Sequence, residues 1–325
     1  RVNSILNSKF NHKTLTFLAP MEGITDSVYR DVAVKHTDLD IICTEFVRLS
    51  GDHFKPKQLK DTYKLYENAT LSVQLMGENP TLFAQTVPHF LELGVSIIDL
   101  NLGCPSPTVN RKGCGVAMLL DWKLLVEVVS SIRKATDGLF SCKMRAGWDN
   151  EENAVEISRI LENEGIDFLT VHPRTKVQRY KGHSNWDLLA EIKSARTIPI
   201  IGNGDIFVPE DAKRMIDHTR VDGIMIGRGI LRNPLLYNQV HQFLETGMYD
   251  YASSDDYKIF YMDYANAMKA ENRHEKAILS KLKEHFSNFH KSLEDGREFW
   301  DRLKVIQELD IFLDQMMGEP FELRR

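Results

Sequence analysis

Cysteine is scarce in this sequence. Its 325 residues include only four cysteines, Cys43, Cys104, Cys114 and Cys142, and no two of them form a Cys-x-x-Cys pair. This number and spacing predict neither a disulfide framework nor a zinc site, and we expect no bound metal. Free thiols are typical of the reducing cytoplasm, where we expect the protein to act.

Long apolar runs and an excess of positive charge are also absent. No segment approaches the roughly 20 apolar residues that span a membrane, and residues 1–13 lack the apolar run of a signal peptide. We therefore expect a soluble protein. The formal net charge is -5, which excludes a generally basic surface, so any nucleic-acid site must be a local patch.

Short apolar runs alternate with longer helical patterns from about residue 15 to residue 240, an order typical of βα units around a parallel sheet. Polar residues follow nearly every run, as they do at the catalytic end of a TIM barrel, so we favour this barrel over a doubly wound open sheet. The eight predicted strands are Leu15–Ala19, Asp40–Thr44, Leu71–Leu75, Ser96–Leu100, Phe140–Arg145, Asp167–Val171, Ile198–Gly202 and Asp222–Ile226.

The βα rhythm ends near residue 244, and apolar residues then recur every three or four positions, which predicts a C-terminal all-α helical domain. We assign residues 1–244 to a TIM-barrel catalytic domain and residues 245–325 to the helical domain, with Gly247 and Ser253–Asp256 as the linker region. The apolar sets are Ile278, Leu282, Phe286 and Phe289, and Leu303, Ile306, Leu309 and Leu313.

Two glycine loops follow the seventh and eighth predicted strands, Gly202-Asn203-Gly204-Asp205 and Gly227-Arg228-Gly229. Barrel enzymes bind phosphate with these two loops, because backbone N–H groups converge there on an anion. Glycine permits close approach of the backbone, and Arg228 adds a positive charge. Either loop alone could be a tight turn, but the two together predict a phosphate site.

Lys143 and Arg145 lie two residues apart on the fifth predicted strand, so both side chains should face the barrel interior. A cation there is costly without an anion nearby. The negative edge of a reduced flavin would supply that anion, and an ion pair with Asp99 or Glu45 is the alternative. The sixth strand ends at His172, whose place at the rim favours a role in binding.

Cys104 lies on a loop after the fourth predicted strand, within Asn101–Pro105. A thiol has an ordinary pKa of about 8.5, so it is mostly protonated at neutral pH and can act as a general acid. Cys43 and Cys142 fall on strands and are better explained as apolar filler. Cys114 lies between two glycines and is a weaker candidate than Cys104.

Taken together, these motifs resemble the dihydrouridine synthase family, in order across nearly the whole barrel. They are Ala19-Pro20-Met21, Asn101–Pro105, Lys143-Met144-Arg145, His172-Pro173-Arg174-Thr175 with Gln178, Tyr180, Gly182 and Trp186, and the two glycine loops. The family more often has a small residue at the position of Pro173. Thr44–Arg48 further resembles the bacterial branch that acts at position 16 of the tRNA D-loop.

The resemblance implies an FMN-dependent enzyme that reduces the 5,6 double bond of a D-loop uridine in tRNA, U16 in that branch, with NADPH as a transient hydride donor. Cys104 would be the catalytic proton donor, and we expect a monomer. The residues expected to hold FMN are Ala19, Pro20, Met21, Gln74, Lys143, His172, Asn203, Gly204, Asp205, Gly227 and Arg228. Those expected to contact the uracil or the rest of the tRNA are Arg48, Asn101, Arg145, Arg174, Lys281 and Lys283.

Two other functions are compatible with the sequence. One is an FMN barrel reductase of a free pyrimidine, in the manner of dihydroorotate dehydrogenases, although the helical tail and Arg48 favour a macromolecular substrate. The other is a tRNA-binding module without catalysis, which the combination of Cys104, Lys143 and Arg145 argues against. The basic stretch from Lys269 to Lys291 could also be an ordinary solvated helix face.

Overall fold

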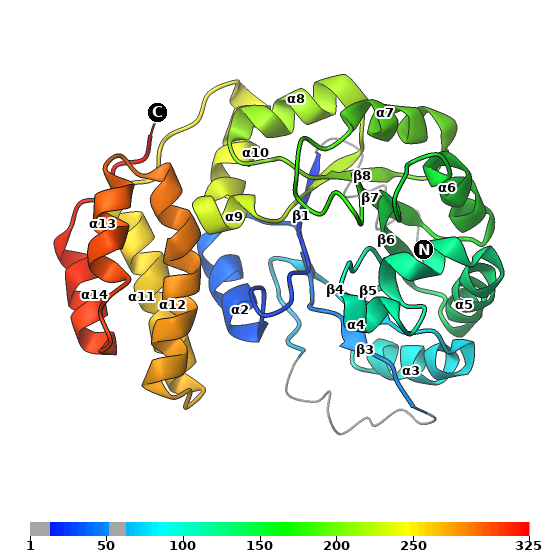
Figure 1. Cartoon of the computed structure of the whole chain (residues 1–325), viewed down its shortest axis with the longest axis horizontal. Coiled ribbons are helices and arrows are strands. Elements are labelled where there is room, and N and C mark those ends of the chain that lie inside the picture. Colours follow the sequence, from blue (N-terminus) through cyan, green and yellow to red (C-terminus); the bar gives the residue numbers. More distant parts are fainter. Residues whose placement is uncertain (1–13, 52–62, 325) are drawn as a thin grey trace. The chain divides into compact units, whose positions relative to one another are not determined.

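The computed structural model describes residues 14–51 and 63–324. Eight parallel strands close into a barrel, because β1 pairs with both β2 and β9 and β2 pairs with β4 (Figure 1). The barrel strands are β1 (Leu15–Leu18), β2 (Ile41–Cys43), β4 (Thr70–Met76), β5 (Ile97–Leu102), β6 (Leu139–Gly147), β7 (Phe168–Thr175), β8 (Ile200–Asn203) and β9 (Gly223–Ile226). The predicted TIM barrel and its eight strands are confirmed.

A further short strand, β3 (Val47–Arg48), was not predicted from the sequence. It pairs in parallel with the last residues of β4, with Arg48 opposite Met76. Two residues are too few for the alternation that reveals a strand in sequence. The strand places Arg48 at the carboxyl end of the barrel strands, and its side chain is exposed.

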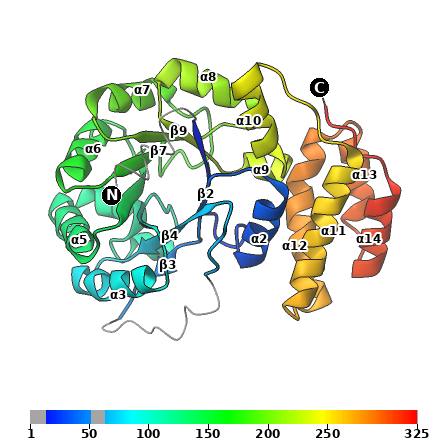
Figure 2. The same cartoon turned by 180° about the vertical axis from the view of Figure 1, so that it is seen from behind.

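Helices follow the strands and lie outside the barrel, as Figures 1 and 2 show for α3 (Pro80–Glu92), α5 (Trp122–Ala135), α6 (Ala154–Asn163), α7 (Trp186–Ala195) and α8 (Pro209–Thr219). Helix α3 begins and ends as its sequence predicts. The Asn79 side chain accepts from two backbone N–H groups, Pro80 occupies the first turn, and Gly94 follows the end with a φ of 84°. No helix in the described part of the chain is long and apolar enough to cross a membrane.

The amino end of the barrel interior is apolar. Its buried cluster takes alternate residues from the strands, as expected for side chains that all face inward: Leu15, Phe17, Ala19, Ile41, Cys43, Ile97, Leu139, Phe168, Ile201 and Met225. The membership of Cys43 in this cluster and the complete burial of Cys142 confirm both as packed core residues. Polar side chains begin one layer further along the same inward faces.

The chain forms two compact units. Within the described part of the chain, the barrel unit comprises residues 14–27, 40–51, 63–205 and 212–226, and the helical unit comprises residues 28–39, 206–211 and 227–324. Residues 28–39 belong to the helical unit because helix α2 (Ser27–His36) packs against its later helices. The ring of Tyr29 packs against those of Phe260, Tyr264 and His285, with centroids 6.0, 5.6 and 5.2 Å apart. A domain boundary at residue 244 stays a prediction.

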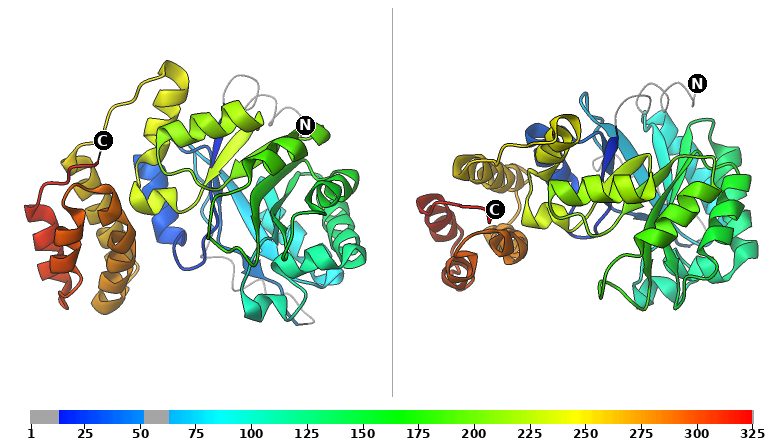
Figure 3. Two further views of the ribbon diagram at one scale, coloured as in Figure 1. Left: turned by 45° about the horizontal axis from the view of Figure 1, so that its top comes forward. Right: turned by 90° about the horizontal axis from the view of Figure 1, so that it is seen from above.

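The helical unit is all-α in its described residues, as Figure 3 shows for α9 (Gly229–Arg232), α10 (Leu236–Thr246), α11 (Ser254–Ala270), α12 (Glu275–Phe289), α13 (Gly296–Leu303) and α14 (Leu309–Gly318). Two details of the prediction were wrong. Ser254–Asp256 open α11 instead of forming a linker, because Ser253 and Asp256 make a reciprocal capping box. Helical spacing from Leu303 to Leu313 spans two helices, with Ile306 in the connection between them.

Candidate functional site

Lys143 lies on the inward face of β6, and its surroundings disfavour its charge. Burial and then the nearby Arg145 lower the pKa of Lys143 to about 8, while Asp99 acts in the opposite direction. Among residues 14–51 and 63–324, Lys143 makes no hydrogen bond or salt bridge, so the alternative ion pair with Asp99 or Glu45 is not formed. An ammonium group held inside a barrel in this way fits an anionic ligand.

Arg145, two residues further along β6, links two loops at the carboxyl end of the barrel. Its Nε donates to the Gly103 carbonyl at 3.0 Å, and its Nη1 donates to the carbonyls of Thr175 and Arg179, each at 3.1 Å. The guanidinium also lies 5.6 Å from the ring centroid of Tyr180. Arg145 is only 4% exposed, so it positions the cysteine loop and the loop after β7.

Asn101 holds the loop that carries Cys104. Its Oδ1 accepts hydrogen bonds from the backbone N–H of Gly103 at 3.0 Å and of Cys104 at 2.9 Å. Its Nδ2 donates to Oε1 of Gln74 at 2.6 Å. The amide oxygen of Asn101 thus anchors the loop, and its contact with the substrate base stays a prediction.

A buried hydrogen-bond chain continues from Asn101 into the barrel. The Nε2 of Gln74 donates to one oxygen of Asp99 at 2.7 Å, and the Ser141 hydroxyl donates to the other at 2.6 Å. Burial raises the pKa of Asp99 to about 6, although these two hydrogen bonds and Lys143 lower it. Sequence reasoning treated Asp99 only as an ion-pair partner for Lys143, yet its spacing of two from Asn101 already placed both on one strand face.

The Cys104 thiol is partly buried against Met76, Val109 and Cys114. Burial raises the pKa of Cys104, and Glu22 adds to that effect, while a backbone N–H at Ser106 and the positive charges of Arg145 and Arg48 oppose it. The thiol is therefore neutral at neutral pH, as a general acid must be.

Cys114, the weaker candidate, has a different environment. Its thiol donates to Oε2 of Glu78 at 2.7 Å and is 2% exposed. Burial and this carboxylate raise the pKa of Cys114 to about 12. A thiol held in this way is a packed interior group, which agrees with the lower rank that the sequence indicated.

His172 and Arg174 lie on the inward face of β7. Arg174 donates from Nη2 to both oxygens of Asp205, at 2.9 and 2.8 Å, and from Nη1 to the Ser184 hydroxyl at 2.9 Å. Its Nη1 also lies 3.3 Å from Nε2 of His172. Arg174 is 1% exposed and is held beside His172, and its contact with tRNA stays a prediction. Ser184 was missed, because a serine in a loop carries no distinctive sequence signal.

The first-strand motif uses its backbone donors internally. The Ala19 N–H donates to the Ile226 carbonyl at 3.0 Å, and the Met21 N–H donates to the Thr25 hydroxyl at 2.9 Å. Pro20 has no N–H to donate. The Met21 carbonyl in turn accepts from the backbone N–H groups of Ile24 and Thr25, each at 3.0 Å, so these hydrogen bonds fix the shape of the turn after β1.

The loop after β8 is closely packed around Gly204. This glycine has a φ of 124°, and an added Cβ would lie 2.3 Å from the Ser184 hydroxyl and 3.0 Å from the His172 ring. The neighbouring Asn203 donates from Nδ2 to the Met225 carbonyl at 2.8 Å, and the Asp205 carboxylate is occupied by Arg174. Asp205 fixes this loop, and its predicted role in binding the cofactor stays a prediction.

The loop after β9 begins the last and longest segment of the helical unit. Arg228 precedes the short helix α9, and its guanidinium lies 5.6 Å from the ring centroid of Phe207. Arg232 lies over the same ring at 4.4 Å. The Phe207 ring therefore makes cation–π contacts with two arginines of this unit. Gly227 lies between Arg228 and the end of β9 in the sequence.

The two lysines expected to contact tRNA phosphates already have partners within the helical unit. Lys281 forms a salt bridge with Glu284 at 2.9 Å, and its side chain is 20% exposed. Lys283 donates to the Ile306 carbonyl, and burial lowers the pKa of Lys283. Their role in RNA binding stays a prediction that the structure leaves untested.

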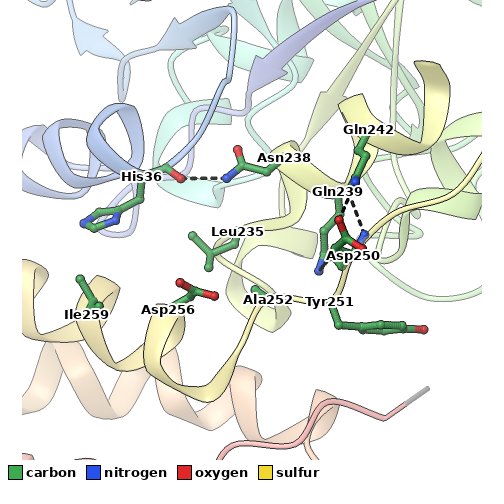
Figure 4. A pocket seen from close by; sticks show the side chains of 10 residues that line it. All are labelled: His36, Leu235, Asn238, Gln239, Gln242, Asp250, Tyr251, Ala252, Asp256 and Ile259. Atoms are coloured by element: carbon green, nitrogen blue, oxygen red, sulfur yellow. Dashed lines mark hydrogen bonds between the residues drawn. The ribbon is translucent and has the colours of Figure 1, made fainter. Parts of the chain in front are cut away.

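A cavity of about 470 Å³ lies within the helical unit between α10 and the start of α11 (Figure 4). Its polar side chains bond with the protein itself. Gln242 donates to the Asp250 carboxylate at 2.8 Å, and Asn238 donates to the His36 carbonyl at 2.9 Å. None of the candidate catalytic residues lines this cavity.

The residues in the barrel unit fit a flavin. Lys143 offers a positive charge without a protein hydrogen-bond partner in the described chain, and Gln74 keeps one amide hydrogen and one lone pair beyond its two bonds. Gly204 is a position that no larger side chain could fill. A family model described as Dihydrouridine synthase (Dus) matches residues 17–318.

The chain belongs to the dihydrouridine synthase family. Membership makes it a flavin-dependent oxidoreductase that forms dihydrouridine, as the motifs implied. Similar curated proteins support this conclusion. The tRNA-dihydrouridine synthase B of Vibrio parahaemolyticus is 33% identical over 259 residues, which cover 79% of this chain and 80% of the relative. The tRNA-dihydrouridine(16) synthase of Pseudomonas syringae pv. tomato is 36% identical over 232 residues, 69% of this chain and 73% of the relative.

A solved structure agrees with the fold of this dihydrouridine synthase family member. Histamine dehydrogenase from Rhizobium sp. 4-9 superposes with a TM-score of 0.52 at 13% identity, covering 78% of this chain and 48% of that chain. At this level of identity, the likeness supports the barrel fold alone. Because relatives with both the B and the (16) names match at similar identity, the position that the enzyme modifies is left to the proposal below.

Proposed function

We propose that this protein is an FMN-dependent tRNA-dihydrouridine synthase that reduces a D-loop uridine, U16, with NADPH as the reductant. Cys104 donates a proton to the base, and Lys143 and Gln74 hold the flavin ring. Arg48 and Arg145 lie toward the substrate. The enzyme acts as a monomer in the cytoplasm.

The observation that carries this proposal is the placement of a neutral thiol on the loop after β5 and of a buried ammonium group on the adjoining strand β6. Lys143 lies in register with Asn101, and Asn101 anchors the loop that carries Cys104. The cation and the thiol therefore belong to one end of one barrel. A flavin and an acid must both reach the same base, which requires this kind of proximity.

The reaction adds a hydride to one carbon of the 5,6 double bond and a proton to the other. When bound, FMN supplies the hydride. Cys104 supplies the proton, because burial keeps its thiol protonated, and the positive charge of Arg145 favours negative charge that develops on a uracil carbonyl. The two additions balance the reaction, and solvent reprotonates the thiolate afterwards.

The tRNA must present the uridine outside its helical stack, since the reacting carbons are inaccessible within folded RNA. Arg48 is exposed and acts electrostatically on Cys104, so it is suited to contact the extruded nucleotide. The assignment of Asn203, Gly204, Gly227 and Arg228 to the flavin phosphate rests on the family resemblance. The choice of U16 rests on the Thr44–Arg48 motif and on relatives with that name.

The test is reoxidation of the reduced protein under anaerobic conditions. We expect unmodified tRNA to reoxidise the bound flavin and free uridine not to do so. Rapid reoxidation by free pyrimidines would support a small-molecule reductase instead. A purified protein without flavin absorbance would support a tRNA-binding module without catalysis. Mapping dihydrouridine in tRNA from cells that lack the protein identifies the position, and loss elsewhere than position 16 would contradict that part of the proposal.

A further inference from the structure

The buried series of hydrogen bonds from Ser141 to the cysteine loop has a defined donor–acceptor direction. Asp99 accepts from both Ser141 and Gln74, Gln74 accepts from Asn101, and Asn101 accepts from the backbone N–H groups of Gly103 and Cys104. The four side chains are at most 9% exposed. Water therefore cannot readily substitute for a mismatched partner, and each donor must meet an acceptor.

The direction originates at Asp99. An ionised carboxylate can only accept, so the Gln74 amide must turn its Nε2 toward Asp99. Its Oε1 then faces Asn101 and requires Nδ2 there, which leaves the oxygen of Asn101 for the loop. If either amide turned over, an N–H group would face another donor or an oxygen would face another acceptor.

We propose that Asp99 is a positioning residue that orients the Gln74 and Asn101 amides and thereby holds the Cys104 loop. The inference deepens the proposed function, because Gln74 is also the residue assigned to the flavin ring. Asp99 does not touch the thiol. It acts through two amides whose orientation it determines, so a residue deep in the barrel sets where the proton donor lies.

Single substitutions that hardly change side-chain size should show whether the donor–acceptor order of these hydrogen bonds matters, apart from side-chain packing. In Asn101→Asp, a carboxylate oxygen would face Oε1 of Gln74, and turning that amide would place the mismatch at Asp99 instead. In Asp99→Asn, the new amide can still accept from Gln74 with its oxygen and donate to the Ser141 hydroxyl with its nitrogen. Asn101→Asp should therefore loosen the loop, and Asp99→Asn should leave it in place.

The double variant, with Asp99→Asn and Asn101→Asp together, reverses the donor–acceptor direction of the hydrogen bonds between positions 99, 74 and 101. Asn at position 99 donates to the turned Gln74 amide and accepts from Ser141. Gln74 then donates to Asp at position 101, whose other oxygen accepts from the loop N–H groups of Gly103 and Cys104. Every group has a partner again, so the second substitution should repair the first.

The experiment measures the alkylation rate of Cys104 by iodoacetamide in the purified flavoprotein, with peptide mass spectrometry to separate Cys104 from the three other thiols. We expect Asn101→Asp to accelerate alkylation by about tenfold or more, because a mismatched buried hydrogen bond weakens the anchor by that order. Asp99→Asn and the double variant should stay within about twofold of the parent. Asp99→Leu, which removes the acceptor, should resemble Asn101→Asp.

Two results would overturn the inference. One is an Asn101→Asp variant that alkylates at the parental rate. The other is a double variant that alkylates as fast as Asn101→Asp, which would indicate a general loss of packing at position 101. Turnover is not the criterion, since a turned Gln74 amide presents a changed edge to the flavin. If the alkylation pattern holds but unmodified tRNA does not reoxidise the reduced parent protein, the proposed function fails while the positioning role stands.

Discussion

Arg174 and Asp205 form an ion pair at the end of the barrel, although they lie 31 residues apart in the chain. Both Asp205 oxygens accept from Nη2 of Arg174, and the Ser184 N–H donates to the same carboxylate at 2.7 Å. Burial alone would raise the pKa of Asp205, but the Ser184 N–H and Arg174 hold it below its usual value. The pair joins β7 to the Gly204 loop.

Arg174→Met should destabilise the protein by about 3 kcal/mol, because it leaves the partly buried Asp205 carboxylate without its charged partner. Urea unfolding monitored by circular dichroism measures this loss. Arg159→Gln provides a control, since Arg159 pairs with Glu156 in an exposed salt bridge whose loss should hardly change the stability. Equal losses in the two variants would show that burial of the Arg174 pair is unimportant.

Lys143→Met should stabilise the flavin-free protein at pH 7. The ammonium is charged in both folded and unfolded chains at this pH, but burial disfavours it only in the folded protein. Because the folded pKa is about 8 against an ordinary 10.5, the wild type regains stability as the pH rises between these values. The difference between the variants should therefore shrink from pH 8 to pH 10.5, as thermal unfolding would show.

The same substitution should weaken flavin binding, which equilibrium titration of the flavin-free protein with FMN would measure. A stabilised Lys143→Met variant that binds FMN as tightly as the parent would contradict the role of Lys143 as the flavin's cation. Loss of both stability and binding would instead indicate that the ammonium makes a favourable interaction within the protein.

Cys104→Ala should keep FMN and lose most turnover on tRNA, because the hydride can still be delivered but the proton donor is missing. Single-turnover oxidation of the reduced variant by unmodified tRNA measures this step. A loss of about 100-fold or more is the range expected for removal of a general acid. Cys114→Ala serves as the comparison, and unchanged oxidation in Cys104→Ala would refute the role of that thiol.

Gly204→Ala should release the flavin and destabilise the barrel unit. The added Cβ meets the Ser184 hydroxyl at 2.3 Å and also occupies a φ that alanine avoids. Gly247→Ala separates these two causes, since Gly247 has a φ of 76° but no atom within 4 Å of an added Cβ. We expect a cost of about 1 kcal/mol for Gly247→Ala and a clearly larger one for Gly204→Ala, by chemical denaturation.

Lys281→Gln and Lys283→Gln together should weaken tRNA binding and reduce its dependence on salt. Each lost phosphate contact lowers the slope of log affinity against log salt by about 0.7 to 0.9. Filter binding at several salt concentrations measures the slope. Lys213→Gln is the matched control, because Lys213 is an exposed lysine paired with a carboxylate on α8. A slope identical to that of the control would exclude phosphate contact by the two lysines.

Several features could be predicted because their signals are local. The alternation of apolar runs and helical patterns predicted the barrel, and a spacing of two predicted the shared inward face of Lys143 and Arg145. The position of Cys104 after the fourth predicted strand placed it at the carboxyl end of the barrel. The capping of α11 by Ser253 was also local, but its serine and acidic residues were interpreted as a loop.

The sequence by itself determined the barrel, its family and the residue types at the carboxyl ends of the strands, because each depends on the order and spacing of neighbouring residues. Only the tertiary structure decided that Arg174 pairs with Asp205 and that Asn101 anchors the cysteine loop. It also decided that Asp99 accepts a hydrogen bond from Gln74, the partner of Asn101. Such pairings join residues that chain order does not bring together. The physical reason is that a buried polar group takes whichever partner the closed barrel places within hydrogen-bond distance.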